Sequence, residues 1–298
     1  MVIVMKNILN YYYHIIVDDN KIDDNGNFIY NNRIFCLYEY KRNNNEIEAL
    51  FYLNEIMLSK NYSINKIVKN VFNQIITSSD DKNYVLIEIK NKYVLKAGIK
   101  FIEAFNDKKM DNLRRDNWGK LWSLKIDYVE YQLMHIKNSY PLINSSVNYY
   151  IGLAENAISY FNMLNLSNVP LYIEHRRFSK GNMYNPVELV IDYKIRDVAE
   201  YIKNCFFYQE MNIYEIKDYV SKLELDNIDY ILLYVRLLYP SYYFDLYENI
   251  INNNEDEEKI KNIVDLSSKY EELLYEIYLI LQKKTTLLGV NWINSKFM

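Results

Sequence analysis

The sequence is poor in glycine, proline and cysteine. It has 298 residues, of which 6 are Gly, 4 are Pro and 2 are Cys. Cys36 and Cys205 lie far apart and have no CxxC motif or neighbouring His, so the sequence indicates neither a disulfide framework nor a zinc site. We therefore expect a reduced, cytosolic setting for the protein.

An excess of one charge and long apolar runs are also missing. The 35 Lys and Arg residues are nearly balanced by 39 Asp and Glu residues, and both signs are mixed along the chain to give a net charge of -4. We therefore expect no broad basic surface and no nucleic-acid partner. No apolar run is long enough to span a bilayer, and residues 1–10 lack the basic region of a signal peptide.

Tyrosine, by contrast, is abundant, with 32 residues, and 50% of the chain is hydrophobic. A chain of this length and composition can bury a large core, in one two-lobed unit or in two domains. Codon bias in an AT-rich genome enriches Tyr and Asn without selection on function. Alternatively, surface tyrosines can be cross-linked oxidatively in protein assemblies, and the sequence leaves both explanations open.

The first part of the chain has the pattern of short strands, rich in β-branched and aromatic residues. The expected strands are residues 12–17, 28–30, 34–40, 74–77 and 84–89. Residues 23–27 and 78–81 carry hairpin-turn signals. Residues 46–59 carry a helical apolar stripe that follows a capping region at residues 43–45.

From residue 93 onward the periodicity is mostly helical. The expected helices are residues 99–107, 121–136, 151–164 and 260–281. Only the short segments at residues 171–173 and 189–191 have the pattern of strands. The sequence therefore predicts an α+β protein with a small antiparallel β lobe at residues 1–92 and a larger, mainly helical lobe at residues 93–298.

Residues 171–200 place polar side chains in an order that suits phosphoryl transfer. The series is His175, Arg177, Asn182, Asp192 and Asp197. Phosphoryl transfer to a hydroxyl needs a carboxylate near the attacking oxygen and oxygen ligands that hold magnesium against the phosphates. The two ligand types are present in this segment, but the base is not.

This order resembles the catalytic loop of the aminoglycoside phosphotransferases, which reads His-Gly-Asp, then an Asn five positions on, then a strand that ends in Asp. Arg177 stands where that family places its catalytic Asp. Further motifs at residues 118–122, 152–158, 196–201 and 236–240 are similar to those of the spore-coat kinase-like proteins of endospore-forming bacteria, the YutH type. The specific motifs cover residues 118–248.

The resemblance implies a two-lobed protein-kinase-like fold with a degenerate catalytic loop at residues 171–200. It also implies that the protein is made in the mother-cell cytoplasm and joins the spore coat during sporulation. Other coat proteins are then its expected partners, and an oligomer is possible in such an assembly.

A nucleotide site in this fold needs a glycine-rich turn over the phosphates and a strand Lys held by a helix Glu. Gly26 is the single glycine of its turn, which also carries two carboxylates. Lys41 is the candidate Lys, with Glu48 or Glu55 as partner, but it also fits an ordinary solvated residue at a strand end. We expect weak or absent ATP binding and no cofactor, and ATP with magnesium if the protein is active.

Arg177 cannot replace a catalytic carboxylate, because its guanidinium stays protonated and only donates hydrogen bonds. A general base contributes roughly a hundredfold to ten-thousandfold in rate. Arg177 could instead fill the magnesium position and pair with Asp192, which would close the site. In a second interpretation Arg177 stabilises charge on the transferred phosphoryl group while Glu174 orients the acceptor.

The remaining polar residues each have a structural and a functional interpretation. Asn182 and Asp192 are either magnesium ligands or, respectively, the cap of a turn after Gly181 and an anchor for the loop backbone. The resemblance gives His175 a structural role, bonding the loop backbone and packing behind Asp192. Asp197 is expected to be the N-cap of the next helix and to tie down the loop. His14 and His135 are isolated, and we expect ordinary surface or core roles for them.

Two segments have the composition of either core or interface, namely the aromatic run at residues 236–244 and the amphipathic helix at residues 260–281. The expected function is a noncatalytic, tyrosine-rich pseudokinase that acts as a coat scaffold. The alternatives are an active small-molecule phosphotransferase that acts on a hydroxyl or amine acceptor, and a nucleotide-binding switch without turnover.

Overall fold

The structure is a computed structural model of the chain. It describes residues 2–17, 22–23, 25–91, 99–136, 139–179, 181–253 and 255–297. The chain forms two compact units: unit 1 comprises Met1–Arg114 and His175–Ile191, and unit 2 comprises Arg115–Glu174 and Asp192–Met298. The lobe boundary expected after residue 92 stays a prediction.

Unit 1 is built on an antiparallel sheet in the order β1-β2-β5-β3, with β4 paired to β5. Its strands are β1 (Asn27–Tyr30), β2 (Arg33–Glu39), β3 (Lys66–Val68), β4 (Thr77–Ser79) and β5 (Lys82–Ile89). The β1–β2 turn is Asn31-Asn32 and the β4–β5 turn is Asp80-Asp81, and all four residues have positive φ. Two-residue hairpin turns of this kind favour Asn and Asp, because these residues tolerate the left-handed region.

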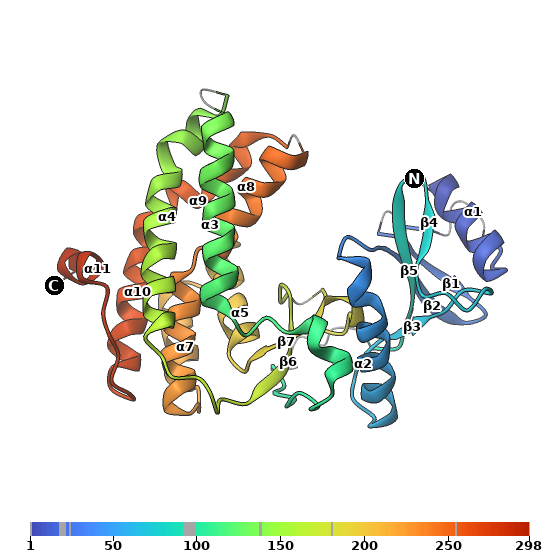
Figure 1. Ribbon diagram of the computed structural model, residues 1–298, viewed down its shortest axis with the longest axis horizontal. Helices are drawn as coiled ribbons and strands as arrows, with labels where there is room; N and C mark the ends of the chain where they lie inside the picture. Colours follow the sequence, from blue (N-terminus) through green and yellow to red (C-terminus); the bar gives the residue numbers. More distant parts are fainter. Residues whose placement is uncertain are drawn as a thin grey trace. The chain divides into compact units, whose positions relative to one another are not determined.

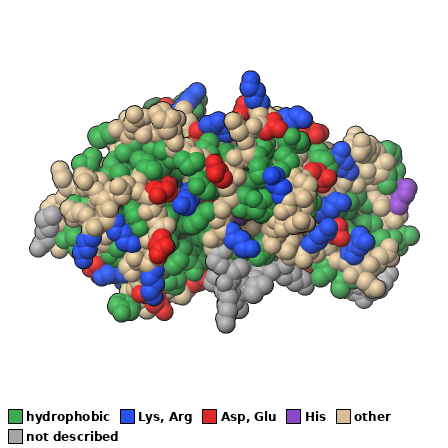
Figure 2. All heavy atoms as spheres, turned by 90° about the horizontal axis from the view of Figure 1, so that it is seen from below, with side chains coloured by type: hydrophobic (Ala, Val, Ile, Leu, Met, Phe, Trp, Pro, Cys, Tyr) green, Lys and Arg blue, Asp and Glu red, His purple; other side chains and the backbone are tan. Residues whose placement is uncertain are grey.

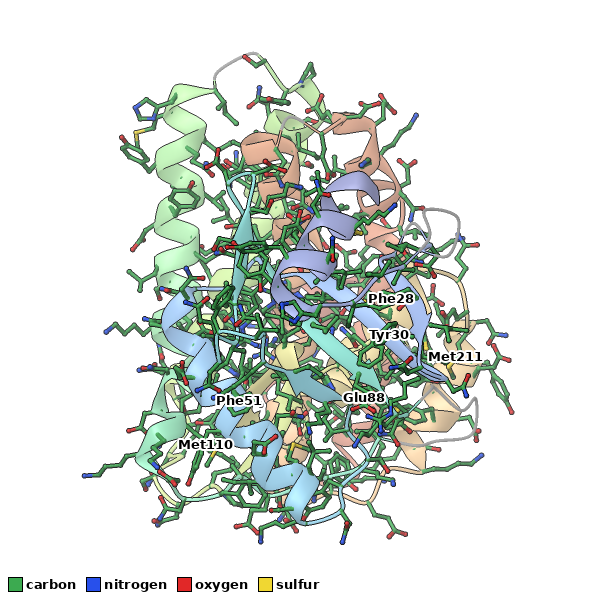
Figure 3. The ribbon with its side chains drawn as sticks, turned by 90° about the vertical axis from the view of Figure 1, so that its right-hand side faces the viewer. Phe28, Tyr30, Phe51, Glu88, Met110 and Met211 are labelled. Atoms are coloured by element: carbon green, nitrogen blue, oxygen red, sulfur yellow. The ribbon has the colours of Figure 1, made fainter. Side chains whose placement is uncertain are left out.

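Helical segments of unit 1 lie before, between and after these strands in the sequence. They are α1 (Val2–Tyr13), η2 (Asn44–Glu46), α2 (Ile47–Ser59), η3 (Lys108–Leu113) and η4 (Pro186–Glu188). α1 places Met5, Ile8 and Leu9 in one cluster with Phe28 and Leu37 of the sheet, and Figure 3 shows α1 beside the strand that carries Phe28. The predicted helix at residues 46–59 is confirmed as α2.

Unit 2 is mainly helical (Figure 1). Its helices are α3 (Trp118–His135), α4 (Pro141–Asn162), α5 (Arg196–Phe207), α6 (Ile213–Ser221), α7 (Asn227–Leu238), α8 (Ser241–Asn253), η5 (Glu257–Ile260), α9 (Lys261–Asp265), α10 (Ser267–Leu281) and α11 (Asn291–Phe297). α3 and α4 pack side by side, and α7 packs against α4, α5 and α10. α7 is apolar on nearly all sides, as expected of a helix enclosed by others.

Strands β6 (Leu171–His175) and β7 (Leu189–Tyr193) pair in a separate two-stranded sheet. The loop between them contains Arg177 and Asn182, whereas His175 lies at the end of β6 and Asp192 lies within β7. Both short strands were expected from the sequence, and both extend about two residues further than their predicted ends.

Two predicted elements are absent, and the strand expected at residues 74–77 is displaced, because β4 begins only at Thr77. Residues 12–17 form no strand, because α1 continues through Tyr13 and the apolar positions Met5, Ile8, Leu9 and Tyr12 have helical spacing. Residues 99–107 form no helix; the helical turn η3 starts one residue later and Asp107 caps it by accepting the N–H of Lys109 at 2.9 Å. Short apolar runs such as these fit more than one element type.

The two segments of uncertain role belong to the core of unit 2. Residues 237–239, 243 and 244 are at most 5% exposed, and Pro240 separates α7 from α8. The helix expected at residues 260–281 is interrupted at Leu266, and its stripe is buried against the unit's own helices α6 and α7. Among the helices of the described residues, none is long and apolar enough to cross a membrane.

Candidate functional site

The loop after β6 is held by its own polar groups. His175 lies at the end of β6, and its Nε2 atom is 3.0 Å from the backbone oxygen of Met183. Its ring packs edge-on against Phe178, with 5.4 Å between ring centroids. This contact agrees with the expected bonding of His175 to the loop backbone, and its packing behind Asp192 stays a prediction. Arg177 donates from Nη1 to the backbone oxygen of Arg176 at 2.9 Å.

Asn182 uses both ends of its side-chain amide within the same loop. Its Oδ1 atom accepts the backbone N–H of Ser179 at 2.8 Å, and its Nδ2 atom donates to the backbone oxygen of Arg177. Asn182 therefore closes the turn, as one of its two interpretations requires. Its role as a metal ligand stays a prediction, and this bonding leaves its oxygen already engaged.

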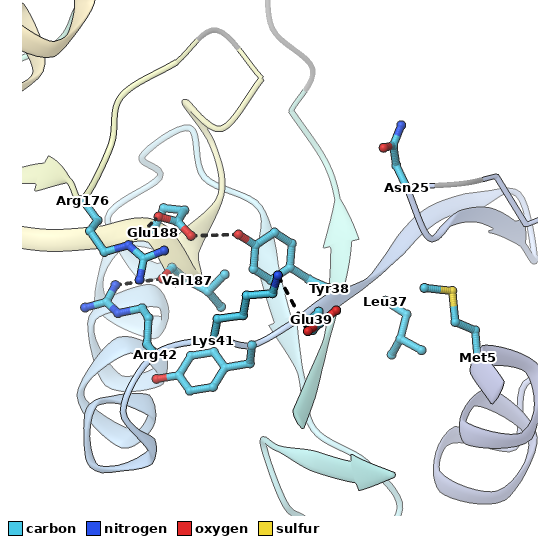
Figure 4. Close-up of a pocket in the computed structure, with 11 residues that line it drawn as sticks. Met5, Asn25, Leu37, Tyr38, Glu39, Lys41, Arg42, Arg176, Val187 and Glu188 are labelled. Carbon is cyan, nitrogen blue, oxygen red and sulfur yellow. Dashed lines mark hydrogen bonds and ion pairs between the residues drawn. The ribbon is translucent and has the colours of Figure 1, made fainter. Parts of the chain in front are cut away.

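A pocket of about 290 Å³ lies in unit 1 (Figure 4). Its polar lining includes Tyr38, Glu39, Lys41, Arg42, Arg176 and Glu188. Tyr38 donates its hydroxyl to Glu188 Oε1 at 2.8 Å. Burial and the neighbouring Glu188 carboxylate raise the pKa of Tyr38 above its ordinary value.

The cations of this pocket are paired with carboxylates. Lys41 Nζ lies 3.8 Å from Glu39, and Arg176 Nε lies 3.4 Å from Glu188. The Lys41 side chain follows the end of β2 and is 72% exposed. This placement matches the interpretation of Lys41 as a solvated residue at a strand end, and a role in cofactor binding stays a prediction.

Arg42, which the sequence did not single out, is a buried cation of unit 1. It donates from Nη1 to the backbone oxygens of Val187 at 2.8 Å and Leu189 at 2.7 Å. Its Nε atom donates to Glu46 at 2.8 Å. Arg42 precedes the helical segment η2, so helical spacing does not pair it with Glu46, and its backbone partners lie about 145 positions away in the sequence.

In the turn at residues 23–27, the Asp23 carboxylate accepts hydrogen bonds from other residues of the same turn. Asp23 accepts the backbone N–H groups of Asn25 at 2.9 Å and Asn27 at 2.8 Å. A hydrogen bond from the Asn27 side chain lowers the pKa of Asp23. Gly26 has a φ of 79°, and a Cβ there would meet Leu37 O at 2.7 Å, so glycine is needed for the turn itself. The turn does not join two strands within the described residues, contrary to our prediction.

Asp192, at the end of β7, is 0% exposed in unit 2. Its Oδ1 atom accepts the Trp118 indole N–H and the Tyr193 backbone N–H, both at 2.8 Å. Its Oδ2 atom accepts Arg196 Nη1 at 2.5 Å. Trp118 is itself held by stacking on Trp122, with 5.0 Å between centroids. Arg196 is thus a counter-ion of Asp192. A pairing of Asp192 with Arg177 stays a prediction.

Burial raises the pKa of Asp192, against the opposing effect of Arg196 and Arg236. Burial and the neighbouring Asp197 carboxylate hold the pKa of Glu174 well above its ordinary value. Glu174 is 1% exposed, and its Oε2 atom accepts the backbone N–H of Asp197 at 2.8 Å. Asp192 and Glu174 are thus two buried carboxyl groups whose pKa values are both raised by burial.

Asp197 is not the N-cap of α5, as we had expected. The N-cap position is Ile195, and Asp197 lies in the first helical turn. Glu174 supplies the missing cap from β6, because it accepts the backbone N–H of Asp197. A cap from a distant strand leaves no local sequence pattern, which explains why the sequence analysis assigned this role to Asp197.

A second group of buried charges lies in the same unit. Arg236 Nη2 donates to Glu200 Oε1 at 3.0 Å, and Lys203 donates to the Tyr239 backbone oxygen at 3.1 Å. The Arg236 guanidinium also lies 5.1 Å from the Trp118 ring centroid. Trp118 therefore contacts both the Asp192 carboxylate and the Arg236 cation.

The two predicted magnesium ligands, Asp192 and Asn182, do not fit magnesium as they are bonded in this fold. The oxygens of Asp192 face hydrogen-bond donors, and one of those donors is a guanidinium that a cation would have to displace. The Asn182 oxygen accepts a backbone N–H. Within the described residues no group of three or more His, Cys, Asp or Glu side chains could hold a metal.

The other two histidines have surface positions. His14 is exposed at the end of α1, and His135 is exposed at the end of α3. The Nδ1 atom of His135 lies 2.8 Å from the backbone oxygen of Tyr131, one helical turn earlier. The ordinary role expected for these isolated histidines agrees with these positions.

The chain matches a family profile described as "Spore coat putative kinase YutH" over residues 6–277. It is 27% identical over 188 residues to the endospore coat-associated protein YutH of Bacillus subtilis (strain 168). That alignment covers 54% of this chain and 56% of the relative, so the chain matches about half the length of this relative.

Two solved structures that are similar to this chain are phosphotransferases. A spectinomycin phosphotransferase in complex with ADP and spectinomycin has a TM-score of 0.54 at 10% identity, covering 93% of this chain and 98% of that one. An aminoglycoside phosphotransferase of Alicyclobacillus acidocaldarius has a TM-score of 0.52 at 9% identity, covering 89% and 95%. At such identities the likeness shows the fold alone, and it confirms the predicted kinase-like α+β class.

Proposed function

Because the chain belongs to the YutH family of kinase-like spore coat proteins, we propose that it is a noncatalytic pseudokinase that acts as a scaffold of the coat. The observation that carries the proposal is the state of Asp192, whose oxygens are bonded to Trp118 and Arg196 inside the core. A carboxylate in this state stabilises the fold. It does not present lone pairs to a metal.

The position of the general base supports the same function. Arg177 occupies the place of the catalytic Asp in the phosphotransferase motif. A guanidinium accepts no proton, so the missing base costs roughly a hundredfold to ten-thousandfold in rate. Glu174 does not replace it, because its buried carboxyl group caps α5.

The pocket of unit 1 favours a second candidate, a nucleotide-binding switch without turnover. It lies beside the turn that contains Asn25 and includes Lys41 in its lining. Its cations are neutralised by carboxylates, however, since Lys41 pairs with Glu39 and Arg176 pairs with Glu188. A triphosphate would meet negative as well as positive charge there, so the scaffold is the favoured function.

A thermal-shift titration with ATP and magnesium tests the proposal, because a ligand that binds the folded state raises its apparent stability. We expect no shift at millimolar nucleotide. The matched control is Asp192→Asn, which keeps the side-chain volume and removes the charge. A shift of several degrees in the parent protein that is lost in the variant would contradict the scaffold and support the switch.

The coat assignment has its own test. A fluorescent fusion should assemble with the coat after synthesis in the mother cell and should be recovered with insoluble coat material. A fusion that stays diffuse throughout sporulation counts against a coat scaffold and leaves the kinase-like fold unaffected.

A further inference from the structure

Unit 1 carries a patch of exposed apolar side chains that do not line its pocket. Tyr11 is 65% exposed, Phe72 is 55% exposed and Val71 is 46% exposed. Tyr11 and Tyr12 lie at the end of α1, and Val71 and Phe72 lie in the loop between β3 and β4. The Phe72 ring centroid is 6.0 Å from that of Tyr11 and 6.1 Å from that of Tyr12. These four residues form one surface, the Tyr11–Phe72 patch.

The loop that presents Phe72 is fixed by hydrogen bonds. Asn70 Oδ1 accepts the backbone N–H groups of Phe72 at 3.0 Å and Gln74 at 2.9 Å. The backbone N–H of Val71 donates to the Tyr12 oxygen at 2.9 Å, which ties the loop to α1. The loop thus holds two apolar side chains toward solvent in one conformation. Such pre-organisation lowers the entropy cost of binding.

The patch lies in an uncharged part of the chain. Residues 7–17 and 70–79 contain no Asp, Glu, Lys or Arg, although charged residues make up 25% of the sequence. In a two-fold symmetric pair, the same surface is used by both subunits. A charge in such a surface can face its own copy, whereas a neutral aromatic surface is complementary to itself.

We propose that the Tyr11–Phe72 patch is the contact surface between two copies of this chain. This proposal goes beyond the scaffold function and does not rest on it. Tyr and other aromatic residues dominate the energetics of interfaces, and charged residues are depleted at interface cores. Stable interfaces bury about 800 Å² per partner. A patch centred on four apolar side chains is smaller, so a weak, concentration-dependent dimer is the expected species.

Sedimentation velocity of the full-length protein over a range of concentrations tests this proposal. We expect the parent protein to shift from monomer to dimer as its concentration rises. Phe72→Ser and Tyr11→Ser should each raise the dimer Kd by at least about tenfold. Tyr214→Ser is the matched control, because Tyr214 is 78% exposed on α6 in unit 2. That variant should keep the parent's Kd.

Salt provides a second readout. Because the patch is uncharged, the dimer should persist when the salt concentration is raised from about 0.1 M to 0.5 M, where exposed ion pairs are screened. Both substituted side chains are exposed, so the variants should melt like the parent protein. A parent that stays monomeric at every concentration overturns the proposal. So does a dimer that salt dissociates or that neither patch substitution weakens.

Discussion

Two ion pairs of the unit 1 pocket and the Asp192–Arg196 pair of unit 2 lie in different surroundings. In the pocket of unit 1, the ion pairs of Lys41 and Arg176 are 3.8 Å and 3.4 Å long, and both cations are substantially exposed. In unit 2, the Asp192–Arg196 pair is 2.5 Å long and almost completely buried. On the face that Figure 2 shows, Lys and Arg side chains are likewise mixed with Asp and Glu side chains. The carboxylate that resembles a metal ligand is therefore a core residue.

A pair within unit 2 isolates the effect of burial. Asp218 and Lys222 are also four residues apart and also 2.5 Å apart, but their side chains are 51% and 71% exposed. Sequence spacing and distance are thus the same as in Asp192–Arg196, and the surroundings differ. Exposed pairs typically contribute little, whereas removing one partner of a buried pair leaves an uncompensated charge.

The largest effect should come from breaking the buried pair. Arg196→Ala should lower the free energy of unfolding by about 3 to 5 kcal/mol, because it leaves Asp192 buried without its counter-ion. Lys222→Ala, the exposed counterpart, should cost less than about 1 kcal/mol. Urea denaturation followed by far-ultraviolet circular dichroism measures both changes.

The same melts test the hypothesis that Arg177 pairs with Asp192. We expect Arg177→Ala to cost less than Arg196→Ala, because Asp192 already bonds to Arg196 and Trp118. If Arg177→Ala proved as costly as Arg196→Ala, Arg177 would share the role of counter-ion. If Arg196→Ala cost no more than Lys222→Ala, the contrast between buried and exposed pairs would fail.

The next largest effect distinguishes two neighbouring cations of unit 1. Arg42→Ala removes hydrogen bonds to Val187, Leu189 and Glu46, and we expect a loss of about 1.5 to 3 kcal/mol. Lys41→Ala should change stability by less than about 0.5 kcal/mol, because its side chain is largely solvated. Chemical denaturation of the two variants side by side measures the difference. Equal losses would mean that Lys41 has a structural role that its exposure does not indicate.

A third, pH-dependent effect concerns Glu174. Its pKa is raised in the folded protein, by burial and by Asp197. The folded state therefore binds a proton more tightly than the unfolded state, and this contribution to stability is lost as the pH rises through the raised pKa. Glu174→Gln keeps an oxygen that accepts the Asp197 N–H and does not ionise.

Unfolding free energies of the parent protein and Glu174→Gln across roughly pH 5 to 8 measure this contribution. The parent should lose stability with rising pH, and the variant should lose less. Burial raises the pKa of Asp192 in the same direction, so part of the slope should remain in the variant. Identical slopes would show that Glu174 does not titrate in this range.

Sequence patterns predicted those structural features that depend on residues close to each other in the chain. The stripe of α2, the hairpin turn at Asp80-Asp81 and the loop bond of His175 follow from spacing or from motif. Features that depend on distant segments could not be predicted. Glu174 caps a helix 23 positions away, and Asp192 bonds to Trp118 from 74 positions away. The sequence resemblance thus located the loop at residues 171–200, but packing decides what its carboxylates do.

Apart from the control variants, the smallest expected effect concerns Asn182, the other predicted metal ligand. Asn182→Ala removes the hydrogen bonds that join its amide to Ser179 and Arg177, in a partly exposed loop, and we expect a loss of about 1 kcal/mol. The interpretation as a turn cap requires this loss to be the same with and without magnesium. The interpretation as a ligand requires magnesium to stabilise the parent protein and not the variant, because a metal that binds only the folded state raises its stability. Calorimetric melts of both proteins with and without millimolar magnesium therefore separate the two roles. A stabilisation by magnesium that Asn182→Ala abolishes would place a metal in the loop and contradict the interpretation of Asn182 as a turn cap alone.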